Sequence, residues 1–499
     1  MKEIIKICRD GNLISVRPLP DDVRSVLEKS LTYIQIKYLR GFAAKEAGRK
    51  MDYKPTACFA LKPSATNPQK LITNYGYYPR VKNELLGLGY RVAFKDLTPH
   101  PNPSVFEPLW SRTKNVAWRH KQKETIEAIL SNPYGRIDCP TGYGKSFIIQ
   151  QIARLLPKAT IHVTTKGAKV IRDIHKALSV ALPDVGLIGA GKNSIGHRVQ
   201  CFCADSLHRS DGKADILLAD EGHELAAQSY LEQLAKYRYT RMYMFSASQD
   251  QRLDKRDFEL EGIFGPIIMQ IKYQEALRHD MIVDIEVRWR DVHMQRNPCD
   301  GMQDTFKDRF GIWRNDYRNS LIAEDARSYP DEQVLILVDT IEHGLYIRKL
   351  LPEFTFVYAQ NGLSVEDRFR YENKKLMTAD DPIMTSKLRA QYESDFESGK
   401  LKKAIATGIW NQGVNFHKLQ VLIRADAGGS PIGDTQLPGR VCRLSDGKAY
   451  GVVHDYRDQF DEGLERRAHS RRRNYAKHGW KQIDVDAGFK TLYQKESFK

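Results

Sequence analysis

The stretch Cys139-Pro-Thr-Gly-Tyr-Gly-Lys-Ser146 decides the fold class of this 499-residue sequence. A short strand is expected before it, at residues 135–138, and an apolar helix after it, at residues 147–156. Glycines at such a strand-to-helix turn let successive backbone N–H groups face a phosphate, and the helix dipole adds positive potential. Lys145 would then reach the β- and γ-phosphates, and the Ser146 hydroxyl would bind Mg²⁺. The first position of the pattern holds cysteine where glycine is usual, which weakens the bare match.

A second pattern, Ile216-Leu-Leu-Ala-Asp-Glu-Gly-His223, places two carboxylates directly after an apolar strand. Ligands of open α/β sheets bind at the carboxyl ends of the strands. Asp220 would hold Mg²⁺ there, and Glu221 would polarise the attacking water. An isolated Asp-Glu pair after a strand is most often a solvated loop or a helix cap. Its place after a phosphate loop in the same sheet favours the functional interpretation.

A third pattern, Thr435-Gln-Leu-Pro-Gly-Arg-Val-Cys-Arg443, carries two arginines three positions apart. This spacing predicts that Arg440 and Arg443 lie on one helical face. One of them would act as an arginine finger, stabilising charge on the transferring phosphoryl group. Such a pair is more often a salt-bridged surface pair, but the Gln and Gly at fixed offsets favour the functional role.

Short apolar runs separated by helix-length segments predict two parallel sheets, each covered on both faces. The first series comprises residues 160–164, 216–219 and 242–245, and the second comprises residues 334–338, 354–358, 404–407, 421–424 and 451–454. The fold class is therefore α/β, with two such layers in tandem and a small α/β domain ahead of them. Residues 276–330 join the two layers and carry no clear pattern.

Composition narrows the class of protein. The chain has 78 Lys and Arg against 62 Asp and Glu, a net charge of +16, which suggests a polyanionic partner without proving one. Mean hydropathy is −0.52, no long uncharged apolar run is present, and charges interrupt the first ten residues. We therefore expect a soluble protein of the cytoplasm (the host cytoplasm if viral) with neither membrane span nor signal peptide. Seven scattered cysteines indicate a reducing compartment, with Cys201 and Cys203 structural in a buried strand.

Taken in order, these patterns resemble the superfamily 2 helicases and translocases over about residues 110–460. Arg119 and Gln122 match the Q motif, and motif I is matched by Pro140, Thr141, Gly142, Tyr143, Gly144, Lys145 and Ser146. Residues 164–166 match motif Ia without its usual Pro-Thr, and residues 220–223 match the DExH box. Motif III is matched by residues 246–248, motif V by residues 406–415 and motif VI by residues 436–443. The resemblance implies two RecA-like lobes that bind and hydrolyse ATP with Mg²⁺ in their cleft. It also implies nucleotide contacts by Gly413 and Gln436, and nucleic-acid backbone contacts by Thr165 and Thr407.

Other segments favour one branch of that superfamily. Arg252 and Asp254, then residues 263–266 and 315–319, resemble branches that remodel double-stranded or branched DNA. The helix, glycine stop and strand expected over residues 75–94, together with the basic stretch that includes Arg471, Arg472 and Arg473, resemble the UvsW-like branch-migrating helicases of tailed phages. The implied function is branch migration, fork regression, unwinding or annealing of branched or forked DNA, such as a Holliday junction or replication fork, in recombination, repair or replication. The three arginines are expected to contact phosphates.

These patterns divide the chain into four predicted parts: a DNA-recognising N-terminal domain at residues 1–105, lobe 1 at 106–280, lobe 2 at 281–460 and a basic tail at 461–499. Three alternatives stay open: a double-strand translocase that does not separate strands, such as a restriction or remodelling motor; an RNA helicase; and a nucleic-acid-binding module that does not hydrolyse ATP. The intact Lys145, Asp220, Glu221 and Arg443 argue against the last. No pattern indicates a protein partner.

Overall fold

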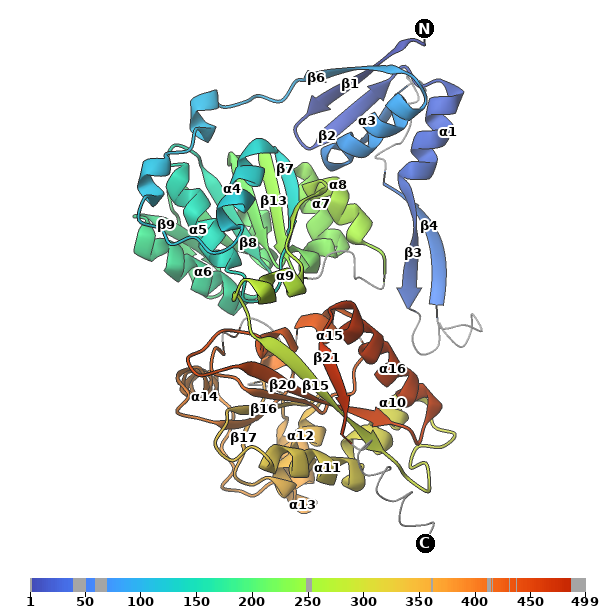
Figure 1. The fold of residues 1–499 in the computed structure, drawn as a ribbon, viewed down its shortest axis with the longest axis vertical. Coiled ribbons are helices and arrows are strands. Elements are labelled where there is room, and N and C mark those ends of the chain that lie inside the picture. Colours follow the sequence, from blue (N-terminus) through green and yellow to red (C-terminus); the bar gives the residue numbers. More distant parts are fainter. Residues whose placement is uncertain are drawn as a thin grey trace. The chain divides into compact units, whose positions relative to one another are not determined.

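The computed structural model describes residues 2–38, 51–58, 70–247, 254–359, 362–410, 414, 416–429, 431–436 and 438–485. The chain forms two compact units: Met1–Pro140 with Gly144–Ile271, and Thr141–Tyr143 with Lys272–Lys499. Each unit is built on a mainly parallel sheet flanked by helices (Figure 1). The predicted α/β class, with two RecA-like parallel sheets and a small N-terminal α/β domain, is confirmed. Among the described residues, no helix is both long and apolar enough to cross a bilayer.

The first sheet has eight strands in the order β10-β9-β11-β8-β12-β13-β7-β14. They are β7 (Tyr134–Asp138), β8 (Ile161–Thr165), β9 (Val185–Gly189), β10 (Lys192–Ser194), β11 (Val199–Cys203), β12 (Ile216–Asp220), β13 (Arg241–Ser246) and β14 (Ile267–Gln270). Its helices are α4 (Gln122–Ser131), α5 (Lys145–Leu155), α6 (Ala168–Ala181), α7 (Gln228–Lys236) and α8 (Asp257–Phe264). Only β10 pairs antiparallel. Every residue of β11 and β12 is buried, as expected for strands covered on both faces, and this includes Cys201 and Cys203.

A separate four-stranded sheet, the N-terminal sheet, has the order β5-β2-β1-β6. Its strands are β1 (Ile4–Asp10), β2 (Leu13–Arg17), β5 (Leu71–Asn74) and β6 (Arg91–Asp96), and its helices are α1 (Asp21–Ser30) and α3 (Tyr78–Gly87). Two further strands, β3 (Thr32–Tyr38) and β4 (Met51–Ala57), pair with each other in a two-stranded ribbon. The helix and strand expected over residues 75–94 are thus present. Proline within the first turn of α3 suits a helix start, because the N–H that proline lacks would have no partner within the helix at that position.

The N-terminal sheet shares its apolar core with the first parallel sheet. One buried cluster contains Ile7 and Tyr77 from the N-terminal sheet region together with Tyr134 and Phe264. The Tyr77 hydroxyl donates to the Phe258 carbonyl of α8 at 2.5 Å. Residues before the proline-rich stretch at 98–104 therefore lie in the same compact unit as the phosphate loop's strand and helix.

The second sheet has seven strands, all paired in parallel, in the order β17-β18-β16-β19-β20-β15-β21. They are β15 (Asp284–Val292), β16 (Val334–Leu337), β17 (Thr355–Val357), β18 (Lys403–Ala406), β19 (Val421–Arg424), β20 (Tyr450–Asp458) and β21 (Lys481–Asp484). Its helices are α9 (Tyr273–Arg278), α10 (Asp304–Lys307), α11 (Asp316–Arg327), α12 (Ile341–Leu350), α13 (Val365–Asn373), α14 (Ser386–Ser398), α15 (Pro431–Gln436) and α16 (Glu462–Lys477). The five strands predicted in this region are all present. Strand β15 comes from the unassigned connecting segment, and α16 with β21 extends the sheet's own structure to residue 484.

Candidate nucleotide-binding site

The phosphate loop lies between β7 and α5, as the sequence predicts. Gly142 and Gly144 have φ of +90° and +97°, in the region that side chains with a Cβ rarely adopt. A Cβ at Gly144 would also come within 2.8 Å of the Gln122 side-chain nitrogen. Lys145 opens the eleven-residue helix α5, so the loop ends at a helix N-terminus with free backbone N–H groups.

The two residues matched to the Q motif, which reads adenine in the helicases that the sequence resembles, contact each other beside this loop. The Gln122 side chain is 2% exposed, and its Oε1 accepts a hydrogen bond from the Arg119 backbone N–H at 3.0 Å. Because Gln122 also lies against Gly144, the start of α4 and the start of α5 meet at one place in the first unit. The structure therefore brings Arg119, Gln122 and Gly144 together.

Lys145 faces the two carboxylates at the end of β12. Its Nζ is ion-paired with Glu221 and lies 3.9 Å from Oδ1 of Asp220. Burial raises the pKa of Asp220 to about 6, although Lys145 opposes the shift. Burial alone would lower the pKa of Lys145, but attraction to Glu221 and Asp220 outweighs it and raises that pKa. Lys145, Asp220 and Glu221 thus form the charged centre that the sequence predicts.

The carboxylate of Asp220 has the chemistry of a Mg²⁺ ligand. Its Oδ1 is buried and accepts no hydrogen bond from any residue that the structure describes. Magnesium prefers oxygen ligands and is usually bound by one or two carboxylates with water and substrate phosphates. Across the described ranges, no group of three or more His, Cys, Asp or Glu side chains is placed to hold a metal. Ser146, the second residue predicted to bind Mg²⁺, lies in the first turn of α5, and its role as a ligand stays a prediction.

The turn after β12 is strained and packed against β13. Glu221 has a φ of +47°, which is uncommon for a residue with a side chain. A Cβ at Gly222 would come within 2.1 Å of the Met244 Cγ, so only glycine fits there. His223 Nδ1 lies 2.9 Å from the Ser246 hydroxyl and 3.5 Å from Glu221 Oε2. His223 and Ser246 thus join the carboxylate turn to motif III. Both residues lie in motifs that the sequence analysis identified, but the contact between them was not predicted.

The arginines of the third pattern belong to the second unit. Arg440 ends a short 3₁₀ turn, η8 (Pro438–Arg440), and Arg443 follows it, so the prediction of one α-helical face is wrong. A proline at 438 removes an N–H that a continuing helix would need. The Nη1 atoms of Arg440 and Arg443 nevertheless both donate to the Val414 carbonyl, at 3.3 and 3.0 Å.

Gln436 lies half-buried at the end of α15. Gly413, and Ser248 and Arg252 of the first unit, lie outside the described residues.

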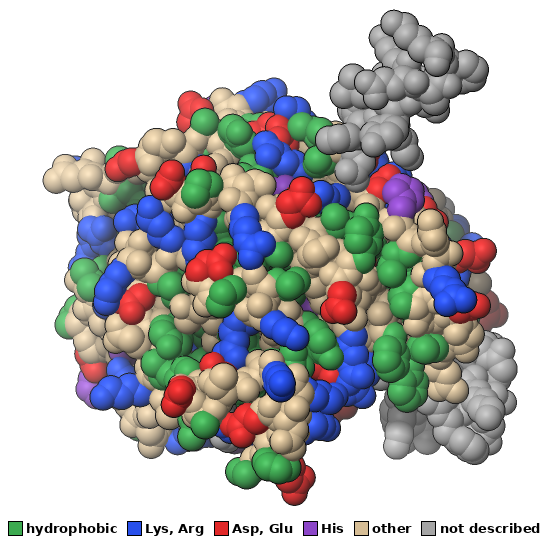
Figure 2. Space-filling model, turned by 90° about the horizontal axis from the view of Figure 1, so that it is seen from below, with side chains coloured by type: hydrophobic (Ala, Val, Ile, Leu, Met, Phe, Trp, Pro, Cys, Tyr) green, Lys and Arg blue, Asp and Glu red, His purple; other side chains and the backbone are tan. Residues whose placement is uncertain are grey.

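The residues predicted to contact nucleic acid differ widely in exposure. Thr165 ends β8 and Thr407 follows β18, and both side chains are buried. Their contact with a nucleic-acid backbone remains a prediction. On the face shown in Figure 2, basic and acidic side chains are interspersed, so the positive charge of that face is spread out.

The prediction that Arg471 contacts phosphates is wrong. Its side chain is fully buried, and its guanidinium is bound to Asp455 of β20. Arg472 is half-buried and bridges to Asp484 at 2.7 Å, whereas Arg473 is exposed. Both of these line a shallow hollow on α16 and β21, together with His469, Ala476 and Gln482. A run of basic residues on a helix does not distinguish the side that packs inward from the side that faces solvent.

Fold and site together define an ATP-hydrolysing enzyme built on RecA-like sheets. The parts that phosphoryl transfer needs are a phosphate loop at a helix N-terminus and a carboxylate pair at the end of a strand in the same sheet; here the pair follows β12, and β13 lies between β12 and β7.

Comparison with known proteins agrees with this class. No family model matches the sequence. A DNA 3'-5' translocase, XPB2, of Sulfurisphaera tokodaii is 22% identical over 382 residues, covering 70% of this chain and 84% of the relative. A protein of the Sulfolobus islandicus filamentous virus that is named as a putative helicase is 22% identical over 423 residues, covering 77% of this chain and 70% of the relative.

Solved structures show the same fold. S. cerevisiae Dbp5 bound to RNA and ADP BeF3 is 14% identical, with a TM-score of 0.52 over 80% of this chain and 98% of its own. T4 UvsW aligns over 96% of this chain and 98% of its own, with 14% identity and a TM-score of 0.40. The resemblance to superfamily 2 helicases and translocases is confirmed.

Proposed function

We propose that this protein is an ATP-dependent DNA helicase or translocase that acts on branched or forked DNA in recombination, repair or replication. The observation that carries the proposal is the cluster of Lys145, Asp220 and Glu221 beside the phosphate loop, in which Asp220 is buried and the other two are half-buried. The net charge of +16 and a relative named as a DNA translocase support DNA as the partner. The preference for branches rests on the sequence resemblance to the UvsW-like helicases.

The residues of the site suggest how hydrolysis would proceed. ATP with Mg²⁺, when bound, supplies the anhydride bond whose cleavage releases free energy. Lys145 is held by Glu221 in the structure, and it can exchange this partner for the β- and γ-phosphates. Glu221 would then be released to orient a water molecule and accept its proton. Asp220 would hold the metal through Oδ1, which accepts no hydrogen bond from the described residues.

In the second unit, Arg440 and Arg443 are the candidates for stabilising the transferring phosphoryl group. Their Nη1 atoms converge on one carbonyl oxygen, so a single local rearrangement would move both. We propose that Arg472 and Arg473 on α16 contact DNA phosphates, which would make that contact largely independent of sequence.

The test is an ATPase assay with four competing stimulators: single-stranded DNA, duplex DNA, a four-way junction of equal length, and RNA. We expect the junction to stimulate hydrolysis most. Stronger stimulation by RNA than by any of the DNA substrates would contradict the proposal that the enzyme acts on DNA. Equal stimulation by duplex and junction would favour a double-strand translocase that does not separate strands; the name of the S. tokodaii relative supports translocation on DNA.

A variant tests the proposed DNA contacts of α16. Arg472→Ala/Arg473→Ala should weaken binding to every DNA substrate, because phosphate contacts do not depend on sequence. The salt dependence of binding should also fall, by about 0.9 in log–log slope for each phosphate that the variant no longer neutralises. Affinity measured across a salt series for wild type and variant gives both quantities, and unchanged values would remove α16 from the DNA interface.

A further inference from the structure

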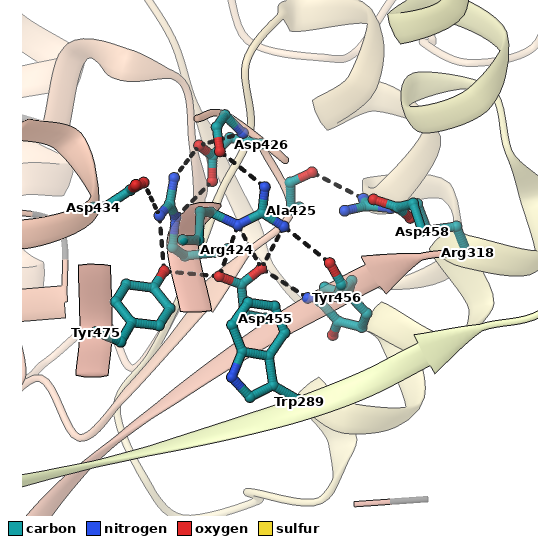
Figure 3. A network of polar contacts seen from close by, with 12 residues as sticks. Trp289, Arg318, Arg424, Ala425, Asp426, Asp434, Asp455, Tyr456, Asp458 and Tyr475 are labelled. Carbon is teal, nitrogen blue, oxygen red and sulfur yellow. Dashed lines mark hydrogen bonds and ion pairs between the residues drawn. The ribbon is translucent and has the colours of Figure 1, made fainter. Parts of the chain in front are cut away.

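The second unit contains a buried network of charges that no step of hydrolysis uses (Figure 3). It joins the ends of β19 and β20 to α15 and α16. Arg424, Arg471 and Arg318 are each 2% exposed or less, and each is bound to an aspartate: Arg424 to Asp426 and Asp434, Arg471 to Asp455, and Arg318 to Asp458. Burying charges is costly even when they are paired, and apolar side chains would often hold a core equally well. A network of this size therefore calls for a reason beyond stability.

One part of the network fixes α15, the helix that leads into motif VI. Asp434 of α15 is fully buried. Its Oδ1 accepts from Arg424 Nη1 at 2.8 Å, and its Oδ2 accepts from the Asn474 side-chain amide of α16 at 2.8 Å. Both carboxylate oxygens are thus occupied, one by β19 and one by α16. Asp434 stands two residues before Gln436, so this clamp holds the start of motif VI.

Another part fixes the connection from β19 to α15. Arg471 Nη1 of α16 donates to the Gly428 carbonyl at 2.8 Å, and Arg318 Nη1 of α11 donates to the Ala425 carbonyl at 2.9 Å. Each backbone contact is made by an arginine whose own charge is neutralised elsewhere in the network. The chain between the sheet and motif VI is therefore held at both ends and along its backbone.

Tyr475 links the two halves of the network. Its hydroxyl accepts from Arg424 Nη1 at 2.8 Å and donates to Asp455 Oδ2 at 2.7 Å. Asp455 in turn binds Arg471. Because Asn474, Arg471 and Tyr475 all come from α16, this one helix contacts Asp434, the Gly428 carbonyl and Arg424.

We propose that Asn474 and Arg471 of α16 are positioning residues for Arg440 and Arg443. This inference rests on the proposed function, in which those two arginines stabilise the transferring phosphoryl group. Rate depends steeply on the placement of such a group, so a shift of about 1 Å can cost about a hundredfold. Helix α16 thereby sets the turnover number without contacting the nucleotide.

The proposal is tested by adding a carboxylate at position 474 and then exchanging the amide and the carboxylate between positions 434 and 474. Asn474→Asp places a carboxylate opposite Asp434, where an amide now donates, and should push α15 away from α16. We expect kcat for ATP hydrolysis to fall about tenfold or more, with KM for ATP little changed. In the double variant Asp434→Asn/Asn474→Asp, the amide and the carboxylate exchange sides. The new amide at 434 can donate to position 474 while its oxygen still accepts from Arg424, so kcat should recover.

Arg466→Gln is the matched control, because it lies on the same helix, is exposed and makes the same change of one charge unit. It should hydrolyse ATP at the wild-type rate. Asn474→Ala, which removes the hydrogen bond without adding charge, serves if Asn474→Asp does not fold; circular dichroism at the assay temperature checks folding. A folded single variant with wild-type kcat, or a folded double variant without recovery, overturns the inference alone. No hydrolysis by the wild type would contradict the proposed function, and this inference with it.

Discussion

At the scale of single residues, burial controls the protonation of His162 on β8. Removal from water lowers the pKa of its imidazole to about 4, from an ordinary value of 6.5. Its Nδ1 lies 2.9 Å from the Tyr239 hydroxyl and 3.3 Å from the Ser210 hydroxyl, so the neutral ring is well accommodated. The folded protein therefore holds this histidine uncharged at pH values where the unfolded chain takes up a proton.

This difference predicts a loss of stability in acid. Between pH 6.5 and 4 the unfolded state binds more protons, so the free energy of unfolding falls as pH falls. From pH 7 to 5 the wild type should lose about 1 to 2 kcal/mol more than His162→Gln, which cannot titrate. Urea unfolding of both proteins at the two pH values measures the difference. Equal losses would show that His162 does not carry this effect.

Between elements, the N-terminal sheet region approaches α8 too closely for any side chain at Gly76. A Cβ added at Gly76 would lie 2.2 Å from the Glu261 carbonyl oxygen and 2.4 Å from that of Gly262. Both atoms belong to the backbone of α8 and cannot move cheaply. Nearby, Arg80 binds the Glu261 carboxylate at 2.7 Å, which holds the same two segments together.

We therefore expect Gly76→Ala to lower the free energy of unfolding by about 2 kcal/mol or more, as overpacking does. Gly87→Ala is the control, because Gly87 ends α3 and a Cβ there would meet nothing within 4 Å. That change should be neutral or stabilising by up to about 1 kcal/mol. Chemical unfolding compares the two variants with the wild type, and equal stability of the two variants would refute the close contact.

The elements that were predictable from the sequence are those with strong local patterns. The central strands appear as apolar runs, and the phosphate loop and carboxylate turn follow them directly. Strand β15 was missed because its residues alternate between buried and half-buried, and its place depends on pairing with β20, which is far away in sequence. Arg471 was misassigned for a related reason: the charge that neutralises it, Asp455, lies on another element, so local composition suggests solvent exposure.

At the scale of the whole molecule, the predicted site residues are divided between two compact units. Lys145, Asp220 and Glu221 lie in the first, and Arg440 and Arg443 lie in the second. The shared core between the N-terminal sheet and the first parallel sheet also limits how function can be dissected. Deleting residues 1–105 would expose buried apolar surface of lobe 1, so substitutions on the surface are the better probe of substrate recognition.

We infer that nucleotide phosphates bound at Lys145 are hydrolysed in response to DNA. The most direct measurement is the ATP hydrolysis rate of the wild type and Lys145→Ala, each with and without junction DNA. We expect the wild-type rate to rise with DNA, and the rate of the folded variant to be lower by about two orders of magnitude or more and not to respond to DNA. A folded Lys145→Ala protein that keeps a near wild-type, DNA-stimulated rate would contradict it.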